Sequence, residues 1–250
     1  MNILKRIFKK LYTLVSYSLS KNISIDFRSE INPFKIKFKN IKSDQKILIM
    51  NSVISGDVSI GGGSKIVDSF VNGNVELERF VSINGPATRL SSRINGIKIG
   101  SFSSIASNVV IQEDYHRTDK ISTYFMSKNL FKSSVAEDID SKGKIIIEED
   151  VWIGSNSVVL SGVTIGRGSV IGAGSVVTKS IPKYSIAVGN PCRVIKKRFN
   201  EEVIESIEKS QWWDMDTKDF NKFKSVFTYS SNDEEIIKLI NSLKVGEKNK

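Results

Sequence analysis

An aliphatic residue returns at every sixth position in the second half of the chain, at Ile147, Ile153, Val159, Ile165, Ile171 and Val177. A period of six is neither the 3.6 residues of an α-helix nor simple alternation, but it contains the two-residue period of a β-strand three times. Each sextet therefore accommodates one short strand and one corner. Small residues suited to tight corners separate the aliphatic positions, as in IGRGSV and IGAGSV. The pattern predicts a parallel β-helix with the aliphatic side chains stacked inside it.

Weaker sextets begin near Ile54 and resume before the long run. Two stretches interrupt them, residues 84–98 and residues 112–144, and the second holds the only histidine of the chain. Interruptions of a strict repeat usually mark loops on one face, which is often the binding face. We expect three parts: an N-terminal basic extension or cap (1–45), a β-helix domain (46–182) with an active-site loop (112–144), and a C-terminal region (183–250).

Two helices are predicted in the C-terminal region. Asn200 has acids behind it and is a suitable N-cap for a helix that continues to Trp212 and Trp213. A second helical stretch covers about residues 233–243.

The N-terminal extension holds most of the positive charge. The formal net charge is +10, and residues 1–50 contain 11 Lys or Arg against 3 Asp or Glu. Residues 3–19 have the spacing of a basic amphipathic helix, for which two interpretations stay open. It either lies on an anionic membrane surface or caps the open end of the β-helix. The rest of the chain is nearly neutral and has no nucleic-acid-binding motif, so we expect no nucleic-acid partner.

Other sequence signals are weaker. The single cysteine, Cys192, excludes an internal disulfide framework and is expected to be a buried small side chain. No apolar run reaches the length of a membrane span, and the start of the chain lacks the features of a signal peptide. We expect a cytoplasmic protein, with the basic N-terminal helix as a candidate for peripheral contact with the inner membrane.

Four segments occur in a defined order: His116 followed by STYF at 122–125, DVWIG at 150–154, GNP at 189–191 and QWWD at 211–214. Together with the sextets they resemble the hexapeptide-repeat acyltransferases with a left-handed β-helix. The resemblance is greatest to the xenobiotic acetyltransferase branch, which includes chloramphenicol and streptogramin acetyltransferases and many surface-polysaccharide O-acetyltransferases. It implies an all-β left-handed parallel β-helix, a homotrimer with active sites between neighbouring subunits, and acetyl-CoA as the co-substrate.

His116 occupies the position of the family's general base. Transfer of an acetyl group from a thioester to a hydroxyl needs a group that removes the hydroxyl proton, and imidazole titrates in the appropriate range. The ring also needs an orienting partner, commonly a carboxylate or a backbone carbonyl. Glu113, Asp114 and Asp119 are near in sequence, and nothing in the sequence chooses among them.

Three further residues are candidates by resemblance. Trp152 is predicted to point outward, one position before inward Ile153, where its indole N–H would help to hold the developing oxyanion. Tyr124 is expected to line the acceptor site, as is Asn84 on a looser match. Packing is the alternative role for both aromatic side chains. Phe125 follows Tyr124 directly where many members read STYPF, which puts the local shape of the acceptor loop in question.

The resemblance also implies a coenzyme A site. Small residues along one edge of the prism are expected to meet the pantetheine arm, and basic residues after GNP are expected to bind the nucleotide phosphates. The alternative for the basic run is a solvated face. The residues are Gly154, Ser155, Ala173, Thr178 and Lys179 for the arm, and Arg193, Lys196 and Lys197 for the phosphates.

The resulting hypothesis is an acetyl-CoA-dependent O-acetyltransferase. The predicted acceptor is a sugar hydroxyl of a capsular polysaccharide, an O-antigen or a related glycan, and His116 drives direct attack on the thioester. One alternative is a drug acetyltransferase of the streptogramin or chloramphenicol type, and another is a non-enzymatic β-helix that serves as a binding module. A zinc carbonic anhydrase of the same fold would need three histidines, so we expect no metal site.

Overall fold

The structure is a computed structural model, and it describes residues 22–32, 34–39, 42, 44–228 and 233–245. The predicted N-terminal helix at 3–19 lies outside the described residues. The chain divides into two units, residues 1–195 and residues 196–250, which are described separately.

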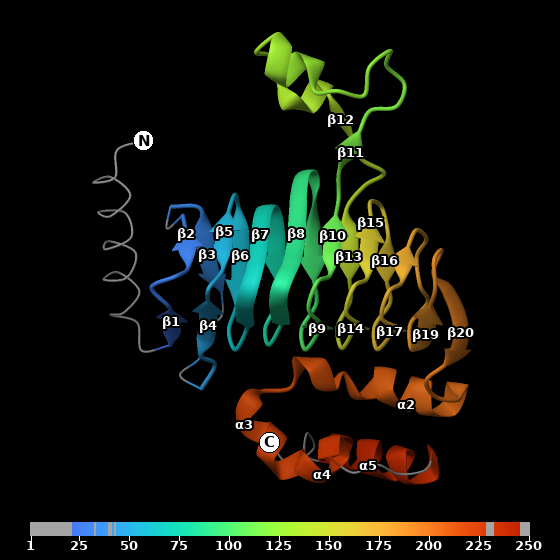
Figure 1. The fold of residues 1–250 in the computed structure, drawn as a ribbon. Coiled ribbons are helices and arrows are strands. Elements are labelled where there is room, and N and C mark those ends of the chain that lie inside the picture. Colours follow the sequence, from blue (N-terminus) through green and yellow to red (C-terminus); the bar gives the residue numbers. More distant parts are fainter. Residues whose placement is uncertain (1–21, 33, 40–41, 43, 229–232, 246–250) are drawn as a thin grey trace. The chain divides into compact units, whose positions relative to one another are not determined.

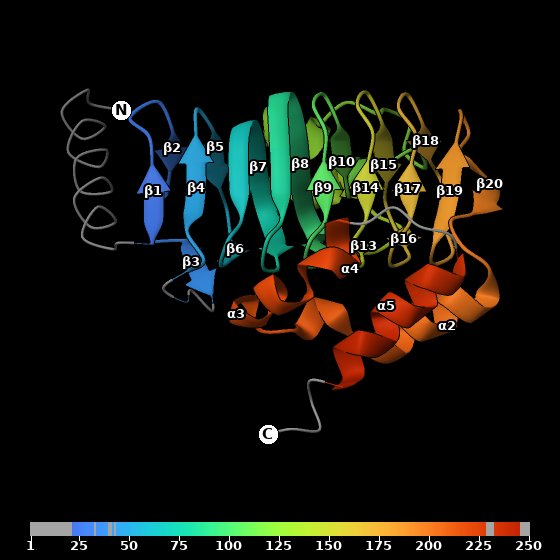
Figure 2. The same ribbon diagram turned by 90° about the horizontal axis from the view of Figure 1, so that it is seen from below.

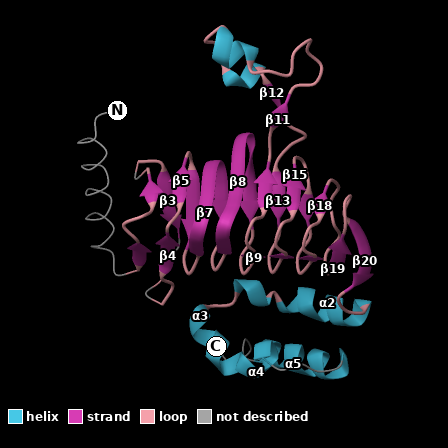
Figure 3. Ribbon diagram, in the orientation of Figure 1, coloured by secondary structure: helices cyan, strands magenta, loops and turns pink. Residues whose placement is uncertain are grey.

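The first unit is a parallel β-helix, as the sextets predict (Figures 1 and 3). Its strands stack in three columns, which we call faces 1, 2 and 3. Two long strands, β7 (Lys65–Leu77) and β8 (Ser82–Ile99), turn through all three faces.

Most of the remaining strands lie on a single face. Face 1, seen as a row in Figure 2, contains β1 (Ile23–Ile25), β4 (Ile47–Met50), β9 (Ser104–Ile105), β14 (Trp152–Ile153), β17 (Val170–Ile171) and β19 (Ser185–Val188). Face 2 contains β2 (Glu30–Ile31), β5 (Val53–Ser55), β10 (Val110–Gln112), β15 (Val158–Leu160) and β18 (Val176–Val177). Face 3 contains β3 (Ile36–Lys39), β6 (Val58–Gly61), β13 (Ile145–Ile147) and β16 (Thr164–Ile165), and Ile181 continues it through a bridge to Ile165.

The core is the stack of aliphatic side chains that the sextets predict. All six residues of the long run are at most 1% exposed. Each sextet advances the chain by one face, so residues eighteen apart stack directly, as Ile147 and Ile165 do. Cys192 is buried in the same core, as predicted, and burial raises the pKa of its thiol.

Corners are tight, and at Gly73 only glycine fits. Gly73 has φ +95°, and a Cβ atom there would come 1.5 Å from the carbonyl oxygen of Ser92 on the next coil. Gly174, at another corner, has φ +71° but open space around the position of a Cβ atom. Gly73 is therefore required both by its positive φ and by the close approach of the next coil, whereas Gly174 is favoured by its positive φ alone.

Two predicted boundaries are wrong. The β-helix begins at Ile23 rather than at residue 46, because β1, β2 and β3 already pair with the strands of the second coil. Residues 84–98 do not leave the β-helix as a loop. They stay in β8 and interrupt the pairing at two corners, where residues 85–87 face Asp68 and residues 93–96 face Asn74.

The second unit is helical, as predicted. α2 (Glu201–Ser210) begins at Asn200, whose side chain accepts a hydrogen bond from the Val203 amide at 2.9 Å. The prediction that this helix continues through Trp213 is wrong, because Gln211 adopts φ +47° and ends it. The elements that follow are η3 (Trp212–Asp214), α3 (Thr217–Phe220), η4 (Asn221–Phe223), α4 (Lys224–Thr228) and α5 (Asp233–Val245).

Aromatic rings hold the segments of this unit together. Trp212 lies 6.2 Å from Trp213 and 5.3 Å from Phe227, and Phe220 lies 5.3 Å from Phe227, measured between ring centroids. None of the described helices is long and apolar enough to cross a membrane.

Candidate active site

The predicted active-site loop is an arm that leaves the β-helix at the corner between faces 2 and 3 (Figure 1). The chain leaves after β10 and returns at β13. Its base is a short antiparallel pair of β11 (Tyr115–His116) and β12 (Ile139–Asp140), and beyond this pair lie η1 (Met126–Leu130) and η2 (Val135–Glu137). The Asp138 carboxylate accepts hydrogen bonds from the amides of Ser127 and Lys128 at 3.0 and 2.9 Å. The arm therefore has a defined internal structure.

Glu113 joins the arm to the β-helix. Its carboxylate is fully buried and accepts hydrogen bonds from the Ser92 hydroxyl at 2.9 Å, the Ile94 amide at 3.1 Å, the Asn95 side chain at 3.1 Å and the Ser141 hydroxyl. Burial alone would raise the pKa of Glu113, but these hydrogen bonds stabilise the ionised form and the pKa lies below its usual value. Ser141 directly follows β12, where the chain returns to the β-helix, so this one carboxylate ties together both ends of the arm.

A second buried acid, Asp114, pairs with Arg93. The Arg93 Nε donates to Asp114 Oδ2 at 2.9 Å, and Nη2 donates to the same oxygen. Asp114 is 1% exposed, and its other oxygen, Oδ1, has no hydrogen-bond partner. Arg93 belongs to the corner insertion at 93–96, within the first interruption of the sextets (84–98). Its ion pair with Asp114 therefore supports the base of the arm, which is the second interruption (112–144).

His116 is exposed on β11, and a backbone carbonyl fixes its orientation. Its Nδ1 lies 2.6 Å from the carbonyl oxygen of Thr123. A carbonyl only accepts hydrogen bonds, so Nδ1 carries the proton and Nε2 presents a lone pair. None of the three acids considered from the sequence binds the ring: Glu113 and Asp114 are engaged in the base of the arm, and Asp119 pairs with Arg117. The peptide oxygen of Thr123 could not be predicted because its position depends on the fold of the arm.

Phe125 packs against the catalytic candidate. Its ring lies 4.2 Å from the His116 ring, and the Arg93 guanidinium lies 5.6 Å from the Phe125 centroid. The Lys128 ammonium lies 5.9 Å from the same centroid. The ring that departs from the STYPF pattern therefore supports the imidazole and is itself held by cation–π contacts.

Several apolar side chains of the arm are exposed. Tyr124 is 57% exposed, and Ile121, Leu130 and Phe131 are exposed as well. Tyr124 is thus available to an acceptor or to a neighbouring subunit, and it contributes nothing to the core.

Trp152 points outward from β14, as predicted, and is 53% exposed beside buried Ile153. It lies on face 1, whereas the arm with His116 leaves from the corner between faces 2 and 3. The two catalytic candidates therefore belong to different sides of the same chain.

The candidates for coenzyme A binding lie on two edges, so the prediction that they share one edge is wrong. Gly154, Ser155 and Ala173 lie at the corner between faces 1 and 2, where the Gly174 amide donates to the Ser155 carbonyl at 2.8 Å. Thr178 and Lys179 follow β18 and lie at the corner between faces 2 and 3. A step of six residues moves the chain to the next edge, and only a step of about eighteen keeps it on the same edge. A Cβ atom at Gly154 would come 2.6 Å from the Ala173 amide, which explains the small residues here.

Asn84 and the basic run complete the candidates. Asn84 is exposed at the corner between faces 1 and 2, on the same edge as Gly154, and its side chain donates to the Ser82 hydroxyl at 3.3 Å. Arg193, Lys196 and Lys197 all lie on β20 (Arg193–Lys197), whose five residues are exposed.

Comparisons with known proteins agree with this fold. Residues 144–179 match the model of the bacterial transferase hexapeptide family, described as six repeats. A probable macrolide acetyltransferase of Lysinibacillus sphaericus is 37% identical over 147 residues, which is 56% of this chain and 81% of the relative. A chloramphenicol acetyltransferase of Agrobacterium fabrum is 32% identical over 188 residues, which is 73% of this chain and 84% of the relative.

A solved structure gives the same result. A variant of AntD, an N-acyltransferase of Bacillus cereus in complex with dTDP-4-amino-4,6-dideoxyglucose and coenzyme A, superposes with a TM-score of 0.56 at 25% identity, covering 70% of this chain and 89% of that chain. The chain belongs to the hexapeptide-repeat acetyltransferase family that includes the chloramphenicol and macrolide acetyltransferases. It is therefore an acetyltransferase, and the alternative of a non-enzymatic binding module is set aside.

Proposed function

We propose that this protein transfers the acetyl group of acetyl-CoA to a hydroxyl of its acceptor, with His116 as the general base. The observation that carries the proposal is the geometry of the imidazole. The Thr123 carbonyl holds Nδ1–H at 2.6 Å, which leaves the exposed Nε2 as an acceptor. This orientation and this exposure support the role of general base that we propose for His116.

The chemistry follows from that tautomer. Nε2 removes the proton of the acceptor hydroxyl while its oxygen attacks the thioester carbonyl carbon, and a C–O bond forms. The tetrahedral intermediate collapses when the C–S bond breaks, and the imidazolium returns the proton to the coenzyme A thiolate. In this scheme the Trp152 indole N–H, which has no hydrogen-bond partner among the described residues, donates to the carbonyl oxygen as it becomes negative. No acyl-enzyme forms.

The site needs two copies of the chain, because His116 and Trp152 lie on different sides of one copy. Two outward-facing apolar ladders support association into a homotrimer. Trp152, Val170 and Ile186 stack on face 1, and Val110, Val158 and Val176 stack on face 2. Apolar ladders on the outside of a sheet favour burial against a partner. In this assembly the arm of one subunit meets face 1 of the next.

The coenzyme would lie along the edges that contain the small residues. Gly154, Ser155 and Ala173 leave room for an extended pantetheine arm on one edge. Thr178 and Lys179 lie on the next edge. The two sets of residues therefore contact either different parts of one coenzyme molecule or coenzyme molecules bound between different subunits. The lysines of β20 supply positive charge for its phosphates.

The acceptor that the comparisons favour is a drug-like alcohol. The relatives carry the names macrolide and chloramphenicol acetyltransferase, and the exposed apolar side chains of the arm, Tyr124 and Phe131 among them, suit a largely apolar acceptor. The glycan acceptor predicted from the sequence is the second candidate. It is favoured by a basic, polar groove on face 3, which is described below.

The predicted location rests on the sequence alone. A cytoplasmic enzyme in peripheral contact with the inner membrane stays a prediction, because the basic segment at 3–19 lies outside the described residues.

The test is acetyl transfer across a panel of acceptors. Purified protein is incubated with acetyl-CoA and with chloramphenicol, a macrolide or a neutral or acidic hexasaccharide, and both thiol release and product mass are measured. The proposal expects an O-acetylated product from at least one acceptor. Thiol release no faster than acceptor-free hydrolysis with every acceptor would contradict it.

A further inference from the structure

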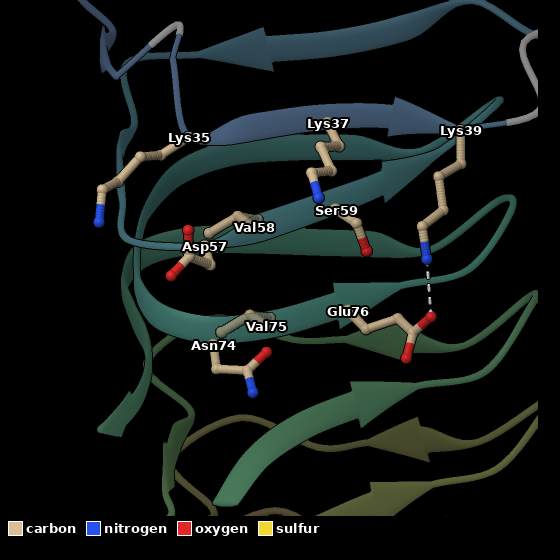
Figure 4. Close-up of a pocket in the computed structure, with 9 residues that line it drawn as sticks. All are labelled: Lys35, Lys37, Lys39, Asp57, Val58, Ser59, Asn74, Val75 and Glu76. Carbon is tan, nitrogen blue, oxygen red and sulfur yellow. Dashed lines mark hydrogen bonds and ion pairs between the residues drawn. The ribbon is translucent and has the colours of Figure 1, made fainter. Parts of the chain in front are cut away.

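A polar groove of about 240 Å³ lies on face 3, across the first three coils (Figure 4). Three lysines project from the outermost strand, β3 and the residue before it, at Lys35, Lys37 and Lys39. Residues two apart in a strand lie on the same side, so the three lysines share the outer side. The residues between them, buried Ile36 and partly buried Phe38, point into the core. The basic row is therefore built into the strand and does not depend on loop conformation.

Among the described residues, an acidic partner is present for Lys39 alone. Lys39 lies opposite Gly61, which has no side chain to block it, and its ammonium reaches Glu76 at 2.8 Å. The Lys35 and Lys37 side chains are exposed and make no ion pair with another described residue. Within the described part of the chain, the ammonium groups of Lys35 and Lys37 are therefore exposed and unpaired by any carboxylate.

The floor of the groove is polar but not purely basic. Lys37 lies opposite Ser59, and Ser59 lies opposite Glu76. Asp57 and Asn74 line the end of the groove at the corner between faces 2 and 3. A Cβ atom at Gly96 would come 3.0 Å from Asn74 Nδ2, so the glycine leaves room for the Asn74 carboxamide.

This combination distinguishes between classes of ligand. A bare phosphate would meet Asp57 and Glu76 as well as the lysines, so a site built for phosphate alone would not carry these acids. A flat apolar drug would find mainly polar side chains, and a nucleic-acid strand would find no aromatic ring on which to stack among the nine lining residues. Hydroxyl groups are both donors and acceptors, and they match a surface that mixes carboxylates, an amide, a hydroxyl and ammonium groups.

We propose that the groove is a binding site for an anionic oligosaccharide, whose carboxylate pairs with Lys35 and Lys37 and whose hydroxyls bond to Asp57, Ser59 and Asn74. The corner at Asp57 and Asn74 belongs to the same edge of the β-helix as the base of the arm. The base of the arm lies two coils beyond Asn74 and three coils beyond Asp57, and neighbouring coils are about 4.8 Å apart, so roughly 10 to 15 Å of edge separates this corner from that base. An oligosaccharide in the groove can extend along this edge toward the arm. Binding itself does not depend on acetyl transfer.

The experiment measures binding without turnover, so it is independent of the proposed function. Full-length protein is titrated calorimetrically, without acetyl-CoA, with oligogalacturonate, with a malto-oligosaccharide of equal length and with inorganic phosphate. The proposal expects oligogalacturonate to bind more tightly than either of the others, and its affinity to fall as salt is added.

Variants then locate the site. Lys35→Glu combined with Lys37→Glu should weaken oligogalacturonate binding by about tenfold or more, because two attractions at a partly screened surface become repulsions. Lys65→Glu reverses one charge on face 1, away from the groove, and is the matched control. It should change the affinity for oligogalacturonate less than twofold. Circular dichroism verifies that each variant is folded.

Three results would overturn the proposal. They are the absence of oligogalacturonate binding by the unmodified protein, equal affinity for the neutral oligosaccharide or for inorganic phosphate, and an equal loss of binding in the Lys65→Glu control.

Discussion

Replacement of Glu113 by glutamine should detach the arm from the β-helix. The buried carboxylate accepts four hydrogen bonds, and a hydrogen bond to a charged group contributes about 1.5 to 3 kcal/mol. A carboxamide has nearly the same shape, but its NH₂ group faces donors on one side and leaves one or two of them unpaired. We expect Glu113→Gln to lower the free energy of unfolding by about 3 kcal/mol at pH 7.

The pH dependence of this difference has a definite sign. The pKa of Glu113 in the folded protein lies below its ordinary value of 4.5. The ionised carboxylate therefore stabilises the fold fully above pH 4.5, and this stabilisation is lost as the pH falls through the folded-state pKa. The difference between the unmodified protein and Glu113→Gln should be largest at neutral pH and should shrink as the pH falls below 4.5 toward the lower pKa of the folded state.

Urea unfolding at one fixed protein concentration measures this difference, and limited proteolysis reports whether the arm is the part that opens. Glu149→Gln is the matched control, since its carboxylate pairs with Arg167 at a partly exposed site and should contribute about 1 kcal/mol or less. If Glu113→Gln unfolded at the same urea concentration as the control and its arm resisted protease, the anchoring role would be refuted.

Three further predictions concern separate parts of the molecule. Arg93 holds the Phe125 ring that packs against His116, so Arg93→Ala should lower kcat by about tenfold or more with little change in the KM for acetyl-CoA, and Arg93→Lys should restore part of the loss. An unchanged kcat in steady-state assays would contradict this positioning role. Lys196→Ala combined with Lys197→Ala should raise the KM for acetyl-CoA more than it lowers kcat, because phosphate contacts are equal in ground and transition states, and an unchanged KM would return both residues to a solvated face. Gly73→Ala should lower the free energy of unfolding by about 3 kcal/mol or more, and Gly174→Ala, which meets no neighbour, by about 1 kcal/mol; equal losses in urea unfolding would show that close approach is unimportant.

The repeat body was predictable because its signal is periodic. Ile147 and Val177 mark the ends of a run in which every sixth side chain is buried, and a strict period needs no knowledge of distant contacts. The first coil was missed because its inward residues, such as Ile31 and Ile36, are not spaced by six and its corner is longer.

The site was predictable only in part. His116 stands out because it is the only histidine and lies in an interruption of the repeat. Its partner, the Thr123 carbonyl, is a backbone group and leaves no trace in side-chain identity. Arg93 could have been singled out, because it lies in the other interruption, but its pairing with Asp114 depends on which coils stack.

The assignment of residues to edges shows the same limit. Gly154 and Thr178 are both small or polar residues at corners, and their sequence positions differ by a multiple of six. Membership of an edge depends on the number of corners passed, modulo three, so a period of six alone does not distinguish them. The structure separates them because Gly154 follows a strand of face 1 and Thr178 follows a strand of face 2.

The central claim is that Nε2 of His116 removes the proton of the acceptor hydroxyl, and His116→Ala tests it most directly. Acetyl transfer from acetyl-CoA to the best acceptor of the panel is measured for both proteins, together with coenzyme A binding and oligomeric state. The account predicts that kcat falls by about two to four orders of magnitude while coenzyme A affinity and assembly are unchanged. Near-normal turnover by a correctly assembled His116→Ala protein would contradict it.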